Sequence, residues 1–197
     1  ATTDEHTAVV RIENAHTNIT YVSVDGNVIS ETINEIKEAE SSTCPMTFDS
    51  IYEFAKAGDI SGILPSIKQQ VEYNSAISNE GLSNDYGANI GRLLLLDDES
   101  PSLETKCKAR AAAGSDARMS GCPLPVVICS GSGNQGLTVS MPIITTAEGL
   151  GKTDEELHRA LVFANLLTLY VKSGIGKLSA YCGVVSAGIV SVAGIAF

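Results

Sequence analysis

The sequence predicts an α+β fold, in which a small antiparallel sheet at the N-terminus precedes a mainly helical body. Two observations predict it: apolar and polar residues alternate over 7–29, and apolar residues take helical spacing from residue 47 onward. An acidic and polar stretch at 34–42 separates the two patterns. We therefore expect a β segment with its linker over residues 1–40 and a helical domain over residues 41–197.

Two strands and a short third one are expected in the β segment. The alternating stretches are Thr7–Glu13 and Asn18–Val24, and the turn signal at 25–27 leads into an apolar pair at 28–29. The connection between the first two strands contains His16. A histidine in a polar turn is usually solvated, and the alternative is that its side chain reaches into a neighbouring site.

Helix start signals divide the helical domain. Thr47, Ser102 and Thr153 are candidate N-caps, and Glu156 completes a capping box with Thr153. Pro65 is compatible with the first turn of a helix. One helix contains four consecutive leucines, which indicate burial. The expected helices cover residues 47–57, 63–78, 90–96, 103–119, 154–172 and 178–197.

Small, polar and thiol residues interrupt an apolar run only at 126–144, which makes this the candidate binding segment. Its glycines can adopt positive φ and let a ligand approach the main chain, while its serine, asparagine and glutamine side chains supply hydrogen-bonding groups. We expect a loop that binds a small polar ligand such as a carboxylate; the alternative is a structural glycine turn. The candidate binding residues are Ser130, Gly131, Ser132, Gly133, Asn134, Gln135 and Gly136.

Asp116 and Arg118 lie just ahead of this segment. A guanidinium is well suited to hold a carboxylate, so Arg118 is a further candidate for substrate binding. The alternative is a structural ion pair between the two residues, or two solvated charges.

The chain carries a formal net charge of −10, and 44% of its residues are hydrophobic. This composition predicts a globular protein, and the acidic balance argues against nucleic acid or an anionic membrane as the main partner. The first residues do not form the basic and then apolar pattern of a signal peptide. We therefore expect a cytoplasmic protein in a reducing compartment.

The five cysteines are odd in number, widely spaced and without a C-x-x-C pair. This pattern does not resemble a secreted disulfide framework, so thiols or metal ligands are expected. Each single cysteine can alternatively be a small buried hydrophobic residue. The five are Cys44, Cys107, Cys122, Cys129 and Cys182.

The last segment, Leu178–Phe197, is almost entirely small or apolar. We expect a helix buried inside a larger protein, of which this chain is a fragment. The alternative is a transmembrane helix, because the segment is about long enough to span a bilayer.

Three ordered segments, Ala111–Gly121, Ser130–Ile143 and Lys177–Gly183, resemble the L-cysteine desulfidases and the α chains of iron–sulfur-dependent L-serine dehydratases. The resemblance implies a pyridoxal-independent β-elimination from L-cysteine or L-serine, assisted by a [4Fe–4S] cluster that three cysteines hold. It implies that Cys129 and Cys182 are cluster ligands and that the segment from Ser130 to Gly136 binds the substrate.

The family pattern has another cysteine after Cys182, where this chain has Ala193 and no thiol. An alternative function is therefore a non-catalytic amino-acid-binding or assembly module that has lost the cluster. The expected partners are a small amino-acid substrate, the missing portion of the full-length chain and a second copy in a homodimer. The base that removes the substrate's α-proton is not identified in this chain.

Overall fold

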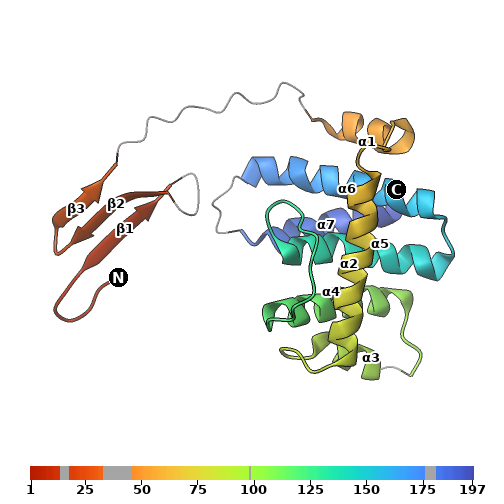
Figure 1. Cartoon of the computed structure of the whole chain (residues 1–197), viewed down its shortest axis with the longest axis horizontal. Coiled ribbons are helices and arrows are strands. Elements are labelled where there is room, and N and C mark those ends of the chain that lie inside the picture. The colour runs from red at the N-terminus through yellow and green to blue at the C-terminus, as the bar shows by residue number, and fades with distance from the viewer. Residues whose placement is uncertain (14–17, 33–45, 98, 176–180) are drawn as a thin grey trace. The chain divides into compact units, whose positions relative to one another are not determined.

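The computed structural model describes residues 1–13, 18–32, 46–97, 99–175 and 181–197 (Figure 1). It divides into two compact units: Ala1–Pro45 with Ile175–Ala180, and Met46–Gly174 with Tyr181–Phe197. The described residues form a three-stranded antiparallel sheet followed by seven helices, so the predicted α+β fold is confirmed. His16, Cys44 and the linker predicted at 34–42 lie outside the described residues.

The sheet of the first unit consists of β1 (Ala8–Ile12), β2 (Ile19–Val24) and β3 (Asn27–Glu31), in that order and antiparallel throughout. Asp25 and Gly26 join β2 to β3 with φ values of 52° and 79°. Two residues with positive φ form the tight hairpin turn that suits the twist of paired strands. The predicted turn is therefore present.

Helices α1 to α7, apart from the last residue of α6, belong to the second unit. They are α1 (Phe48–Ala57), α2 (Leu64–Ser83), α3 (Ile90–Leu96), α4 (Leu103–Met119), α5 (Gly133–Leu150), α6 (Asp154–Ile175) and α7 (Gly183–Ala196). The three predicted N-caps are confirmed: the hydroxyls of Thr47, Ser102 and Thr153 each accept a hydrogen bond from the backbone N–H three residues later. Each cap satisfies one of the amides that a helix start leaves without a partner.

Helix α5 lies at the centre of this unit. It packs against α2, α4 and α7, and Figure 1 shows α2 running across α4, α5 and α6. Leu137, Met141 and Ile144 of α5 are fully buried together with Ile77 of α2 and Leu161 of α6. Burying such a side chain contributes about 1.5–3 kcal/mol, so this core holds α5 firmly. No described helix is both long and apolar enough to cross a membrane.

Two sequence expectations about this unit are wrong. A loop was expected through Gly136 and no helix was expected over 133–150, but α5 covers these residues, so 133–136 form its first turn. The leucines of α3 were expected to be buried, but Leu93 and Leu96 are 56% and 79% exposed. Helix α3 is a short surface element that buries only Gly91 fully. Helix α2 also extends further than predicted, to Ser83, and the described part of the last helix begins at Gly183.

Candidate functional site

A tight turn precedes α5 and carries the first candidate residues. Cys129 and Ser132 exchange two backbone hydrogen bonds, each 3.1 Å long. Between them, Ser130 and Gly131 have φ values of 46° and 90°. Positive φ is uncommon for a residue with a side chain, so the pairing of Cys129 with Ser132 holds Ser130 in a conformation that it rarely adopts. Only Gly131 among the three candidate glycines uses the left-handed region.

Gln135 links this turn to the start of α7. The Ser130 hydroxyl donates a hydrogen bond to Oε1 of Gln135, whose side chain is buried. On its other side, the Gln135 amide lies against Gly183, where an added Cβ would be 2.3 Å from Nε2. Cys182 is the N-cap residue of α7 and directly precedes Gly183. The turn at Cys129 and the start of α7 therefore meet at the same end of α5.

The first turn of α5 is left without a side-chain cap. Ser132 occupies the N-cap position, but its hydroxyl accepts no hydrogen bond from the helix. The first intrahelical bond of α5 runs from the N–H of Gly136 to the carbonyl of Ser132. Helix geometry leaves the N–H groups of the three preceding residues, Gly133, Asn134 and Gln135, without an intrahelical acceptor. Three backbone donors and the positive end of the helix dipole thus coincide here.

Arg118 lies over this helix start. Its Nη1 donates a 3.0 Å hydrogen bond to Oδ1 of Asn134, and its guanidinium packs so closely on Gly133 that an added Cβ would lie 2.3 Å from Nε. A cation at a helix N-terminus is unfavourable unless an anion lies close to both. The ion pair with Asp116, one of the alternatives that the sequence left open, is not formed, and the Asp116 carboxylate accepts the N–H of Ile90.

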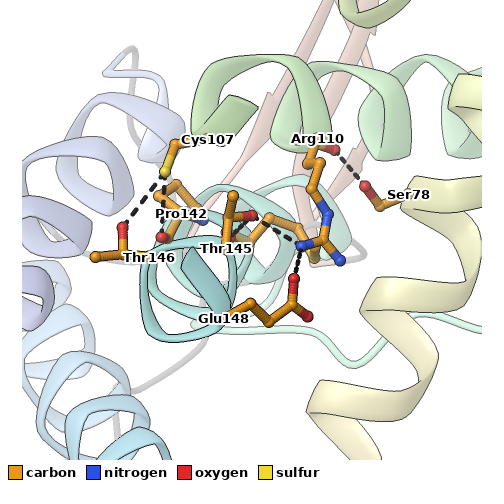
Figure 2. Close-up of polar contacts among 8 residues, drawn as sticks. Ser78, Cys107, Arg110, Pro142, Thr145, Thr146 and Glu148 are labelled. Carbon is orange, nitrogen blue, oxygen red and sulfur yellow. Dashed lines mark hydrogen bonds and ion pairs between the residues drawn. The ribbon is translucent and has the colours of Figure 1, made fainter. Parts of the chain in front are cut away.

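The described cysteines differ in their surroundings. Cys129 is buried, and burial raises the pKa of its thiol, although hydrogen bonds with the Thr168 side chain and the Ser130 backbone oppose this effect. Cys182 is exposed. The Cys107 thiol contacts the Pro142 carbonyl and the Thr146 hydroxyl on α5, both at 3.4 Å (Figure 2).

Cys122 belongs to a different group of side chains. It hydrogen-bonds Tyr86, and together with Glu80 this contact raises the pKa of Tyr86 to about 12. Neither Cys107 nor Cys122 lines the cavity that contains Cys129.

A cavity of about 310 Å³ lies beside Cys129 and Ser130, between α2 and α6. The side-chain amides of Gln70 and Asn165 line it and bond one another reciprocally, at 3.2 and 2.7 Å. The volume is in the usual range for a small-molecule site.

Asn74 is buried and supports the segment that leads into the turn. Its Oδ1 accepts the N–H of Val127 at 2.9 Å, and its Nδ2 donates to the Ser140 hydroxyl at 3.0 Å. The sequence pattern did not single out Gln70 or Asn74. They could have been recognised as two amide side chains, four residues apart, on a helix face that otherwise carries Ile67 and Ile77.

The family model described as "Serine dehydratase alpha chain" matches residues 21–197. The chain belongs to the serine dehydratase alpha-chain family. It is also similar to UPF0597 proteins, with 45% identity over 196 residues to that of Lachnoclostridium phytofermentans and 47% over 191 residues to that of Desulfitobacterium hafniense. These alignments cover 98% and 95% of this chain but 46% and 44% of the two relatives. This member of the family therefore spans less than half the length of these relatives. No solved structure matches it.

The described part of this serine dehydratase alpha-chain family member does not fit a [4Fe–4S] cluster by itself. Among these residues, no group of three His, Cys, Asp or Glu side chains is arranged to hold a metal ion. Cys129 and Cys182 belong to segments that meet at one end of α5, but one thiol is buried and the other is exposed. Their role as cluster ligands stays a prediction, and a cluster would need further ligands from outside the described residues.

Proposed function

We propose that the first turn of α5 and Arg118 bind the carboxylate of a small amino acid, in a protein that acts as a serine dehydratase-like lyase. The observation that carries the proposal is the guanidinium of Arg118 resting on Gly133, above a helix start that has no side-chain cap. A carboxylate between the two would accept backbone N–H groups and charge-assisted bonds from the guanidinium.

Ser130 is placed to bind the ammonium group of the same amino acid. Its hydroxyl hydrogen is directed to Gln135, which leaves its oxygen lone pairs to accept a bond from a substrate ammonium group. We propose L-serine and L-cysteine as substrates. Both are small amino acids, and both are substrates of the families that this sequence resembles.

The proposed reaction is β-elimination. A base removes the α-proton, the β-hydroxide or hydrosulfide leaves, and the enamine hydrolyses to pyruvate and ammonia. Among the described residues at the turn, Arg118, Asn134 and Gln135 are not bases at neutral pH, and the raised pKa of Cys129 makes it a poor one. We therefore assign only substrate binding to this chain, and we propose that the base comes from the remaining length of the protein, in a cytoplasmic assembly.

Measurement of pyruvate tests this proposal. The full-length Lachnoclostridium phytofermentans relative would be prepared anaerobically, its iron and sulfide quantified, and pyruvate formation measured with L-serine and L-cysteine. We expect pyruvate from at least one of them, with hydrogen sulfide as a further product from L-cysteine. A protein that carries iron and sulfide but forms no pyruvate from either amino acid would overturn the lyase proposal.

A non-catalytic amino-acid-binding module is the second candidate. The lack of a metal-holding group among the described residues favours it. Thermal unfolding of the metal-free 197-residue chain with L-serine separates the two candidates. Stabilisation by L-serine without metal, combined with absence of pyruvate from the full-length relative, supports the binding module, whereas stabilisation that requires iron supports the lyase.

A further inference from the structure

We propose that a second cavity, at the opposite end of α5, binds a carboxylate that carries an aliphatic chain. The cavity has a volume of about 540 Å³, which suits a small organic molecule. Leu82 of α2, Leu95 of α3 and Leu103 of α4 line it, so three helices contribute aliphatic surface to one hollow. This surface would bury an aliphatic chain and gain from removing it from water.

Two cations of α4 line the same cavity. Lys106 and Arg110 are four residues apart, so their side chains lie on the same helix face. Lys106 is exposed and makes no ion pair with a described residue. Among the described residues that line the cavity, Glu148 of α5 is the one carboxylate, which leaves one positive charge in excess among them. An anionic ligand would balance this charge.

Arg110 has unused hydrogen-bonding capacity. Its side chain is only 13% exposed, and Figure 2 shows it pointing from α4 to Thr145 and Glu148 on α5. The Nη1 atom donates to both of these residues, at 3.1 Å to the Thr145 hydroxyl. The buried Nε finds no acceptor among the described residues. A guanidinium has five N–H donors and both of the bonds to Thr145 and Glu148 use Nη1, so a second acceptor at Nη2, on the cavity side, would be stabilising.

These features define the ligand class. A carboxylate between Lys106 and Arg110 would take up the excess charge, and its chain would extend toward the leucines. No aromatic side chain of the described residues lines the cavity, so an aliphatic chain is favoured over a ring that stacks. If the ligand also carries an ammonium group, Glu148 is the acceptor beside it.

The second cavity is separate from the proposed amino-acid site. Thr145 lies 12 residues after Gly133 on the same helix. At 1.5 Å per residue the two positions are roughly 18 Å apart. Neither Arg118 nor any candidate residue from 130 to 136 lines the second cavity, so the two proposals can fail independently.

Calorimetric titration of the 197-residue chain with isocaproate tests the proposal, with the neutral isohexanol as the matched compound. We expect saturable binding of isocaproate and markedly weaker binding of isohexanol. Lys106→Gln should weaken isocaproate binding by about tenfold, because it removes one charge-assisted bond. The matched control is Lys108→Gln, which removes another exposed lysine of α4 outside the cavity and should leave the affinity unchanged.

Two further comparisons complete the test. Arg118→Lys should leave isocaproate binding unchanged. If L-leucine binds more tightly than isocaproate, Glu148 accepts the ammonium group of the ligand. The opposite order of affinities assigns the site to carboxylates without an amine. The proposal would be overturned if neither isocaproate nor L-leucine bound saturably. It would also be overturned if Lys106→Gln and Lys108→Gln lost the same affinity for isocaproate, or if isohexanol bound as tightly as isocaproate.

Discussion

The Nη1 atom of Arg118 donates a 3.0 Å hydrogen bond to Oδ1 of Asn134, which joins the last turn of α4 to the first turn of α5. The same guanidinium packs on Gly133. Two groups that both attract anions therefore meet at one point, with the turn at Ser130 and the start of α7 beside them. The stability and binding of this arrangement can be tested residue by residue.

Gly133→Ala should weaken amino-acid binding with little change in stability. The new Cβ would lie 2.3 Å from Arg118 Nε, so the guanidinium must move away from the helix start. We expect about a tenfold loss of L-serine affinity, the size of one charge-assisted bond. Calorimetric titration and thermal unfolding measure the two effects. The control is Gly62→Ala, where nothing lies within 4 Å of the added Cβ. An unchanged affinity in Gly133→Ala would contradict the role of Arg118.

Gly136→Ala should destabilise the second unit. Its Cβ would lie 2.1 Å from the carbonyl oxygen of Val127 and 3.1 Å from the backbone nitrogen of Cys129. Backbone atoms cannot turn aside as a side chain can, so we expect a loss of about 3 kcal/mol in the free energy of unfolding. Denaturant unfolding checks the value. Gly188→Ala on α7 is the control, because its nearest neighbour is the Thr138 methyl at 3.9 Å. Equal stabilities of the two variants would refute the close approach at Gly136.

Glu156→Gln should destabilise the protein at neutral pH but not in strong acid. The Glu156 carboxylate accepts bonds from Thr153 and Lys152, with the Thr153 backbone N–H the largest cause, and its pKa falls to about 2 from 4.5. A lowered pKa gives stability that is present above the unfolded value of 4.5 and is lost as the pH falls toward 2. The melting temperatures of wild type and variant should therefore converge over this window.

Glu72→Gln, at an exposed position of α2, is the control for this pH series. Its difference from the wild type should stay small and constant between neutral and acid pH. A Glu156→Gln difference that persists unchanged at low pH would mean that the carboxylate charge is not what stabilises the start of α6.

Cys182 should react with iodoacetamide far faster than Cys129 in the folded chain. Cys182 is exposed, whereas Cys129 is 5% exposed and burial raises the pKa of its thiol. The thiolate is the reactive form, so we expect at least about a hundredfold difference in rate. Mass spectrometry of the labelled peptides measures both rates, and unfolded protein serves as the reference. Similar rates in the folded chain would show that Cys129 is accessible.

Local patterns predicted most of the secondary structure. The alternation over 7–29, the N-caps at Thr47 and Ser102, and the capping box at Thr153 depend on residues close together in sequence, and the structure confirms them. Helix α5 was not predicted, because glycine, serine and asparagine in 130–136 favour a loop when they are considered alone and 137–144 showed only an apolar run. In the structure, the first turn of α5 contacts Val127 and Arg118, which lie outside the segment 130–136. The composition of the segment alone does not reveal these contacts.

The candidate site was predictable only in part. The sequence indicated the segment at 129–136 and Arg118, and the structure brings Arg118 to Asn134. It did not indicate that Gln70 of α2 and Asn165 of α6 line the cavity beside Cys129, because these residues are 95 positions apart in the chain. The exposure of Leu93 and Leu96 was likewise unpredictable, since the four-leucine run carries no information on which neighbour covers it.

Backbone amide chemical shifts of the isotope-labelled 197-residue chain, followed during titration with L-serine, test the central claim most directly. We predict that the largest saturable changes occur at the N–H groups of Gly133, Asn134 and Gln135, and that Arg118→Lys reduces them while Arg92→Lys on α3 does not. Chemical-shift changes confined to other parts of the chain would contradict the proposed carboxylate site at the start of α5. The absence of any change at L-serine concentrations that stabilise the protein would contradict it as well.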